Sequence, residues 1–315
     1  MITIIMATFN GQEYIKEQLE SIKNQTYKNW CLVVRDDCSS DNTIDIIKKF
    51  ADEVEQEVIL KINKKPSGSA KKNFALLLND AKDADYVMFC DQDDIWKKNK
   101  IEMTFKKMKQ AEELYGKQIP LLVHGDVEVI DDKGSIIADS MFQLSHIDAD
   151  SGLSKILIQN HVTGCTMMCN NILIRGIYEY ASSDKIIMHD YLAALYASVF
   201  GKIEVIKKPL LSYRQHGDNS VGAKNNNNPL YLFKRLSEGK KSYKRAMSES
   251  AQQIEYFVDI YKAEFMSENL IKEYELMSEY AQLRNKSKIS RVFFYKRNNV
   301  WKKGTIRKIM QVIWG

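Results

Sequence analysis

Residues 86–96, YVMFCDQDDIW, indicate both the fold of this chain and the place of its site. Five apolar residues in a row predict a buried strand, which runs directly into Asp91-Gln92-Asp93-Asp94. Carboxylates two residues apart on an extended chain point the same way, so Asp91 and Asp93 can address one divalent cation, Mg²⁺ or Mn²⁺. The alternative is a solvated acidic turn or a helix N-cap, in which the helix dipole stabilises Asp94.

Strand and helix patterns alternate through the first half of the chain. Short apolar runs predict strands, and apolar residues at helical spacing predict helices between them. This alternation predicts an α/β fold with a mostly parallel sheet and helices on both faces. The predicted strands are 2–7, 31–35, 57–62 and 86–90, and the helical stripes lie at 15–22, 44–50, 74–81 and 101–108.

Polar residues follow three of these strands at the point where each one ends. They are Thr8-Phe9-Asn10, Asp36-Asp37 and the acidic run at 91–94. Ligands of open α/β sheets bind beyond the carboxyl ends of the strands. We therefore expect one site built from three strand ends, where a carboxylate at 36–37 can accept the imide N–H of a uracil or thymine ring.

Two further motifs lie in the second half of the chain. His189-Asp190 open a predicted helix, whose dipole is expected to lower the pKa of Asp190 and keep it charged, as a general base must be. An ordinary capping aspartate is the alternative. Arg214 and His216, in YRQH, can bind a diphosphate, and a histidine can also bind a metal, although a lone histidine is more often structural.

The chain divides into two predicted regions. Four asparagines at 225–228, followed by Pro229, predict a linker. We expect an α/β domain over 1–222 and a helical, basic region over 229–315. The second region has no acidic residue after Glu279 but ten Lys or Arg, with aromatic side chains among them. This pattern suits an anionic membrane surface, and the alternative is a helix packed on the first domain. Nucleic acid is not an expected partner, because no nucleic-acid-binding motif is present.

Composition excludes several classes of protein. With 315 residues, of which 44% are hydrophobic and 28% charged, the chain has an ordinary globular composition, which excludes disorder. No apolar run approaches the roughly 20 residues that span a bilayer. The first residues, MITIIMATFN, read as a strand and not as a signal peptide. We therefore expect a cytoplasmic protein.

Seven motifs, taken in order over about residues 1–222, resemble those of the family-two glycosyltransferases with the GT-A fold. They are TFNG at 8–11, QTY at 25–27, DDCSSDNT at 36–43, FCDQDDIW at 89–96, TGCTMM at 163–168, MHD at 188–190, and YRQH at 213–216 with Asn219. The DQDD-x-W, MHD and YRQH variants are most similar to those of bacterial rhamnosyltransferases of cell-wall rhamnan and capsule assembly. Cys38 departs from the pattern, since the family commonly has glycine there, and a slightly different turn is expected.

The resemblance implies a role for each matching residue. Asp190 would be the catalytic base, and Asp91 and Asp93 the metal-binding motif, with His216 near the metal or the diphosphate. The donor-binding residues would be Thr8, Asn10, Asp36, Asp37, Lys72, Asn73, Asp91 and Arg214, and the acceptor-binding residues Thr163, Gly164 and His189.

These roles imply an inverting, metal-dependent glycosyltransferase, peripheral on the inner face of the plasma membrane. It would move L-rhamnose from dTDP-rhamnose to a lipid-linked glycan, with a UDP-hexose donor as the alternative. A sugar nucleotidyltransferase is less favoured, because residues 7–11 lack a glycine-rich phosphate loop. A degenerate glycan-binding protein is also less favoured, because the acidic residues of the motifs are intact.

Overall fold

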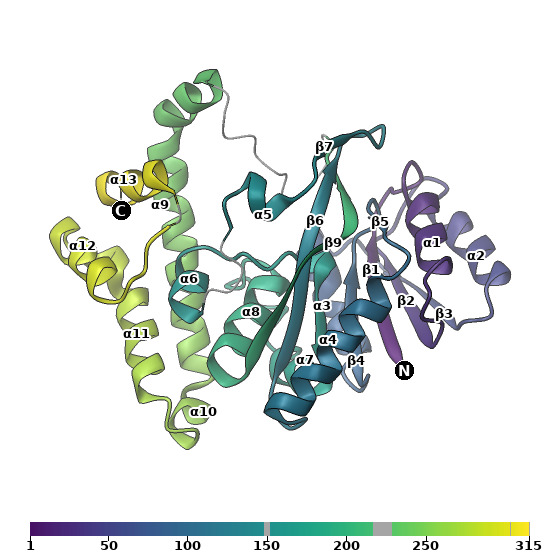
Figure 1. Ribbon diagram of the computed structural model, residues 1–315, viewed down its shortest axis with the longest axis horizontal. Helices are drawn as coiled ribbons and strands as arrows, with labels where there is room; N and C mark the ends of the chain where they lie inside the picture. Colours follow the sequence, from purple (N-terminus) through teal and green to yellow (C-terminus); the bar gives the residue numbers. More distant parts are fainter. Residues whose placement is uncertain (148–151, 217–228, 303, 315) are drawn as a thin grey trace.

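A nine-stranded sheet forms the centre of the computed structural model, which describes residues 1–147, 152–216, 229–302 and 304–314 (Figure 1). The strand order is β3-β2-β1-β4-β8-β6-β9-β5, and β7 pairs with β6 outside this path. Asn219, the predicted linker at 225–228 and the predicted domain end at 222 lie outside the described residues.

The N-terminal half of the sheet is parallel, as the alternating pattern predicts. β1 (Ile2–Thr8) pairs in parallel with β2 (Trp30–Asp36) and with β4 (Tyr86–Cys90), and β2 pairs in parallel with β3 (Val58–Ile62). The carboxyl ends of these strands lie at one edge of the sheet. The polar residues that follow β1, β2 and β4 therefore meet at that edge.

The second half of the sheet adds antiparallel strands. β6 (Leu121–Ile130) is parallel to β9 (Lys202–Arg214) but antiparallel to β7 (Ile136–Ala138) and β8 (Met168–Asn170). β8 is also antiparallel to β4, and β5 (Ile95–Trp96) to β9. The α/β prediction is confirmed, but β5, β7 and β8 are too short to leave an apolar pattern. β9 carries the start of the YRQH motif towards β5.

Helices cover both faces of the sheet because side chains alternate along each buried strand. Ile5 and Phe89 belong to a core on one face, with α3, α7 and α8, whereas Ile4 and Met88 belong to a core on the other face, with α1, α2 and α4. The bounds are α1 Ile15–Lys23, α2 Thr43–Glu53, α3 Ala70–Asp80, α4 Lys100–Tyr115, α7 Asn171–Ile177 and α8 His189–Phe200.

The C-terminal helices pack on the same side of the sheet as α3 and α8 (Figure 1). Phe257, Tyr280 and Tyr295, from three different helices, are fully buried in one cluster with Tyr191 of α8. Burying side chains of this size contributes about 1.5–3 kcal/mol each, so the two predicted regions share a core. The helices are α9 Pro229–Ile260, α10 Lys262–Ser267, α11 Ile271–Gln282, α12 Lys288–Arg297 and α13 Thr305–Trp314; two short helices, α5 Met141–Leu144 and α6 Leu153–Ile158, precede them.

Candidate active site

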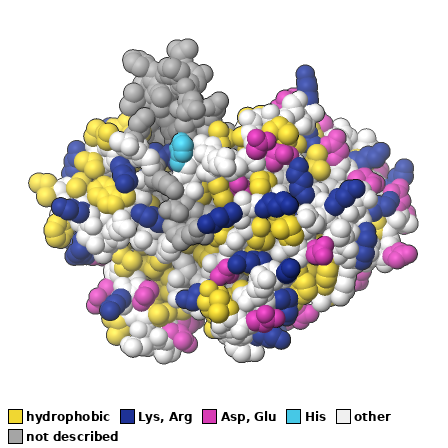
Figure 2. Space-filling model, in the orientation of Figure 1, with side chains coloured by type: hydrophobic (Ala, Val, Ile, Leu, Met, Phe, Trp, Pro, Cys, Tyr) yellow, Lys and Arg dark blue, Asp and Glu magenta, His cyan; other side chains and the backbone are white. Residues whose placement is uncertain are grey.

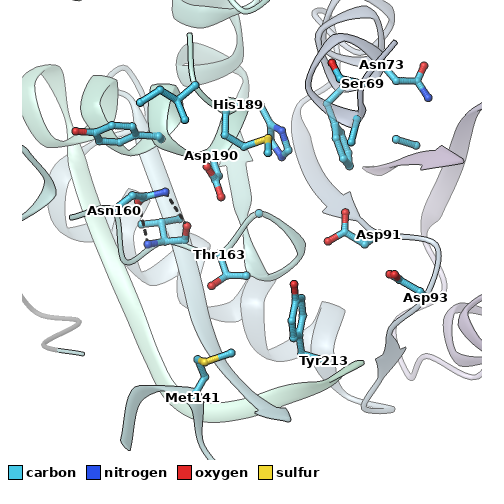
Figure 3. Close-up of a pocket in the computed structure, with 18 of the residues that line it drawn as sticks. Ser69, Asn73, Asp91, Asp93, Met141, Asn160, Thr163, His189, Asp190 and Tyr213 are labelled. Carbon is cyan, nitrogen blue, oxygen red and sulfur yellow. Dashed lines mark hydrogen bonds between the residues drawn. The ribbon is translucent and has the colours of Figure 1, made fainter. Parts of the chain in front are cut away.

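A cavity of about 1650 Å³ opens beyond the carboxyl ends of β1 and β4 (Figure 3). Its walls come from segments far apart in the sequence: the loops after β1, β2 and β4, the N-terminal ends of α3 and α8, residues 159–164, the end of β9, and parts of α9 and α13. The three strand ends expected to build one site therefore do so, but the C-terminal helices complete it.

Asp91 and Asp93 line the cavity, and Figure 3 labels both there. Nε2 of His216 lies 2.8 Å from Oδ2 of Asp93, and the His216 ring stacks on Tyr14 with ring centroids 4.9 Å apart. Burial, then the nearby charges of Asp93 and Asp190, raise the pKa of Asp91 to about 7. Carboxylates crowded in this way favour a bound divalent cation, so the arrangement fits a metal site better than a solvated acidic turn.

Asp94 turns into the interior instead. It is fully buried, and its Oδ1 accepts the backbone N–H of Arg214 at 3.2 Å. Single atoms of Asp91, Asp94 and Cys165 lie within 4.8 Å of one another, which makes a second candidate cation site. Burial raises the pKa of the Cys165 thiol well above its usual range, and Mg²⁺ and Mn²⁺ prefer oxygen ligands with access to water and substrate phosphates. The cavity-facing Asp91 and Asp93 therefore suit such an ion better.

Arg214 supports the acidic motif from behind and does not enter the cavity. Its Nε donates to the carbonyl of Asp93 at 3.0 Å, and its Nη1 to the carbonyl of Asp132 at 3.0 Å. The guanidinium also pairs with Glu17 and lies 4.8 Å from the ring centroid of Tyr14. Its side chain is only 3% exposed. The planar guanidinium thus holds the turn that carries Asp93, and its donor-binding role stays a prediction.

Hydroxyl groups hold the two carboxylates at the end of β2. The hydroxyls of Thr8 and Ser39 donate to Asp36 at 2.9 and 2.6 Å, and Asp36 is fully buried. Asp37 lines the cavity, where it accepts the backbone N–H of Ser67 at 2.6 Å and its hydroxyl at 2.8 Å. Asp36 is therefore a support, and Asp37 is the carboxylate that a ligand can reach.

Of the other expected donor residues, two line the cavity and one does not. Asn10 does so with a left-handed backbone, φ 45°, and Asn73 does so while its Nδ2 donates to the Arg35 carbonyl at 2.8 Å. Lys72 points away: its Nζ lies 3.5 Å from Asp184, and its side chain is 46% exposed. The residues of α3 that line the cavity are Ala70, Asn73 and Phe74, which share one face at i, i+3 and i+4 spacing, and Lys72 lies off that face.

Gln92 joins the loop after β1 to the loop after β4. Its Oε1 accepts the N–H of Phe9 at 2.9 Å, and its Nε2 donates to the Phe9 carbonyl at 3.0 Å. A Cβ at Gly11 would lie 2.4 Å from Oε1 of Gln92, so a larger residue there would displace this amide from its hydrogen bonds. The TFNG and DQDD motifs thus meet through one amide side chain.

Cys38 keeps the backbone shape that glycine would have. Its φ is 67°, in the left-handed region, and its Sγ donates to the carbonyl of Asn63 at 3.1 Å. The expected change of turn was therefore wrong: the surrounding contacts impose the left-handed conformation on a residue that disfavours it.

Asp190 and Asp91 both lie at the cavity, on different walls (Figure 3). Asp190 is the second residue of α8, and the backbone N–H groups of Tyr191 and Gly164 hydrogen-bond to it. Burial nevertheless raises its pKa to about 7. The expected lowering was wrong, because the loss of water around the carboxylate outweighs the helix dipole and the two N–H donors. A pKa near the working pH suits a general base.

The expected acceptor residues Thr163, Gly164 and His189 also line the cavity. The His189 ring packs against Phe89 and Phe74, with centroids 5.1 and 4.2 Å away, and burial lowers its pKa to about 3. A Cβ at Gly164 would lie 2.9 Å from Nε2 of His189. His189 is therefore an uncharged wall of the cavity rather than a cation.

Several lining residues carry no sequence signal for a site. The stretch PSGS at 66–69 indicates only a loop, yet Ser67 bonds Asp37. Lys302, Arg307 and Trp314 line the cavity from a segment whose composition suggested a membrane surface. Only the tertiary contacts could reveal either group.

The N-terminal part of the chain matches a known family. Residues 3–120 match the family described as "Glycosyl transferase family 2". The chain contains a family 2 glycosyltransferase domain. The matched residues run from β1 through α4 and include the loops after β1, β2 and β4 that hold Thr8, Asp37 and Asp93.

Relatives of the glycosyltransferase agree with this family. The chain is 29% identical over 228 residues to the dTDP-rhamnosyl transferase RfbG of Shigella flexneri, which covers 69% of this chain and 74% of that protein. It is 37% identical over 109 residues to the UDP-Glc:alpha-D-GlcNAc-diphosphoundecaprenol beta-1,3-glucosyltransferase WfgD of Escherichia coli, which covers 34% of this chain and 41% of that protein. The chain thus aligns with less than half the length of the second relative.

Solved structures share the fold of the glycosyltransferase. S. aureus TarS in complex with UDP-GlcNAc matches with a TM-score of 0.56 at 18% identity, over 80% of this chain and 66% of that one. The mannosyltransferase PcManGT from Pyrobaculum calidifontis, in complex with GDP-Man and Mn²⁺, matches with a TM-score of 0.52 at 14% identity, over 99% of this chain and 86% of that one. The expectation of a GT-A fold is confirmed.

Proposed function

We propose that this glycosyltransferase moves L-rhamnose from dTDP-rhamnose to a lipid-linked glycan, with inversion of the anomeric carbon. One observation carries the proposal: Asp91 and Asp93 lie on one wall of the cavity and Asp190 on another. A single displacement needs a stabilised leaving diphosphate on one side of the sugar and a base on the other. The cavity provides acidic groups for both tasks.

The acidic residues of the cavity then have distinct tasks. Asp190 accepts the proton of the attacking acceptor hydroxyl, and the N–H groups of Tyr191 and Gly164 hold its carboxylate in place. Asp37 accepts the imide N–H of the pyrimidine. Asp91 and Asp93 would hold a divalent cation, Mg²⁺ or Mn²⁺, with His216 beside Asp93; bound there, the cation would neutralise charge on the leaving diphosphate.

The rhamnose donor rests on the match to RfbG, which covers more of both chains than the match to WfgD. A UDP-hexose is the second candidate donor, since WfgD is by its name a glucosyltransferase that uses UDP-Glc and is more similar over the segment it matches. Both donors carry a pyrimidine, so the same contacts at Asp37 serve either one.

A donor-hydrolysis panel tests the proposal. With Mg²⁺ present, dTDP-rhamnose should be hydrolysed at least about tenfold faster than UDP-glucose, UDP-GlcNAc or GDP-mannose, because the sugar pocket discriminates hydroxyl positions. GDP-mannose tests whether a pyrimidine is needed. Fastest hydrolysis of UDP-glucose would replace the rhamnose donor by the second candidate, and hydrolysis of none would contradict the proposed function.

The C-terminal helices carry exposed apolar side chains near basic ones. Four apolar side chains on α12 and α13 are 52–83% exposed, and Figure 2 shows hydrophobic side chains beside Lys and Arg at the edge of the molecule where these helices lie. No described helix is long and apolar enough to cross a bilayer. We therefore propose a peripheral contact through these side chains, Ile289, Phe293, Ile309 and Ile313.

Substituting two of these residues should release the protein from anionic vesicles. Truncation at 287 is a poor test, because Phe294 and Tyr295 are buried in the shared core. Ile309→Ser with Ile313→Ser keeps that core and removes apolar area that inserts between headgroups, at about 25 cal/mol per Å². Ile136→Ser with Ile137→Ser, at 60% and 50% exposed positions on β7, is the matched control.

Co-sedimentation with phosphatidylglycerol vesicles measures the effect. The wild type and the β7 control should pellet, more weakly as salt rises, whereas the α13 variant should stay largely in the supernatant. Equal pelleting of all three proteins would mean that α13 only packs on the catalytic domain.

A further inference from the structure

Acidic and basic side chains occupy different parts of the cavity. Its acidic residues all come from the α/β part, in the loops after β1, β2 and β4 and at the start of α8. Among the described residues that line it, the lysine and the arginine are Lys302 and Arg307, and both come from the C-terminal segment. No described acidic residue comes from that segment's wall. The described lining is therefore acidic on one side and basic on the other.

Lys302 is held in place by a buried amide. Its backbone N–H donates to Oε1 of Gln311 at 2.8 Å, and Nε2 of the fully buried Gln311 donates to the Val300 carbonyl at 2.8 Å. Nζ of Lys302 lies 4.6 Å from the ring centroid of Tyr243, which also lines the cavity. The ammonium group is thus placed by the fold of the turn before α13 and not by a flexible tail.

Arg307 links α13 to the opposite wall. Its Nη1 donates to the carbonyl of Ser145, which follows α5, at 3.3 Å. Met310 and Trp314, on the same side of α13, line the cavity next to it, whereas Ile309 and Ile313 are 52% and 54% exposed. One face of α13 therefore presents Arg307, Met310 and Trp314 to the cavity, and the other presents Ile309 and Ile313 to the exterior.

We infer that Lys302 and Arg307 bind the phosphate or diphosphate of a lipid-linked acceptor. The inference rests on the proposed function and assigns its acceptor subsite. The donor diphosphate belongs at the acidic side, with the cation that Asp91 and Asp93 would hold, so two cations on the other wall match a second anion. Tyr243, Met310 and Trp314 supply apolar contacts for the first isoprene units. In the proposed membrane contact, Ile309 and Ile313 would hold this wall at the bilayer, where such an acceptor resides.

Farnesyl diphosphate, a short prenyl diphosphate that dissolves in water, is the probe for this site. Lys302→Gln with Arg307→Gln removes both charges at nearly constant size. Lys308→Gln removes one charge from the same helix, at an exposed position that does not line the cavity. Titration calorimetry should show binding at least about tenfold weaker for the double variant, or 1.4 kcal/mol, and within about twofold of wild type for Lys308→Gln.

A double variant that keeps both positive charges is the control for a folding defect. Lys302→Arg with Arg307→Lys should bind farnesyl diphosphate nearly as well as the wild type, and thermal melting should be similar for all the variants. Unchanged binding by the double glutamine variant would overturn the inference, and so would a charge-retaining pair that binds as weakly as the glutamine pair.

Competition distinguishes the possible sources of the phosphate. Inorganic pyrophosphate should compete with farnesyl diphosphate, whereas farnesol and dihexanoyl phosphatidylglycerol should compete at least about tenfold less well. Equal competition by the phosphatidylglycerol would make this a general lipid-headgroup site and overturn the inference. Binding of dTDP, measured on the same proteins, tests the donor site separately: its absence from the wild type would contradict the proposed function and not the phosphate site.

Discussion

Replacing Asp93 by alanine should reduce sugar transfer by far more than about 100-fold, because a charge-stabilising cation contributes several kcal/mol to the transition state. Asp93 is the carboxylate that lines the cavity, bonds to His216 at 2.8 Å and sits on the turn held by Arg214. Its loss removes one of the two carboxylates predicted to bind the cation. Transfer assays over a range of Mg²⁺ and Mn²⁺ concentrations measure the effect.

The fold should survive this substitution. The charge of Asp93 helps to raise the pKa of Asp91, so Asp93→Ala relieves repulsion and the thermal midpoint should not fall. Asp139→Ala, at an exposed position, is the matched control and should keep wild-type activity. Full activity of wild type in excess chelator, or of Asp93→Ala in buffer, would rule out the metal role.

Replacing Asp190 by asparagine should abolish most transfer while dTDP binding survives, because asparagine keeps the size but cannot take a proton. A positioned general base is worth about 10²–10⁴-fold in rate. Asp45→Asn is the matched control, since Asp45 is also in the first turn of a helix but is exposed at the surface. Near-normal transfer by Asp190→Asn would leave Asp190 with the role of an ordinary helix-terminal aspartate.

The pKa of Asp190 gives this prediction a pH dependence. Since burial raises that pKa to about 7, wild-type transfer should rise with pH through about 7 as the base loses its proton. Asp91 has a pKa near the same value, so saturating metal is needed to keep it ionised throughout. The residual transfer activity of Asp190→Asn should not show this rise with pH, because residue 190 then has no proton to lose.

The raised pKa of Asp190 also makes stability depend on pH. Stability should fall as pH rises, whereas activity should increase. A carboxyl whose pKa is raised on folding binds its proton more tightly in the folded state, so its contribution to stability is lost as pH rises through about 7. Asp190→Asn should therefore raise the free energy of unfolding at pH 8 by about 4 kcal/mol, with little effect at pH 4. Denaturant melts at both pH values measure this, and a loss of stability at pH 8 would contradict the burial of a charged Asp190.

Local patterns predicted the parallel part of the fold well. The predicted strand at 86–90 coincides with β4, and the helical stripe at 15–22 lies within α1. Both predictions succeed because the apolar residues are buried, and short-range periodicity reflects burial. Short strands such as β5 and β8 were missed, since two or three residues cannot show a period. The pKa of Asp190 was predicted in the wrong direction, because its desolvation comes from cavity walls that are remote in sequence.

The sequence by itself determined the order of the elements and the residue types at the strand ends. Parallel strands bring their carboxyl ends to one edge, so Thr8, Asp37 and Asp93 had to meet there. Only the tertiary structure decided which groups face the cavity: helix rotation turned Lys72 outward, and burial placed Arg214 behind the turn that it supports. It alone brought Lys302 and Arg307 to the same cavity, because that contact depends on packing between elements far apart along the chain, and no local pattern encodes such packing.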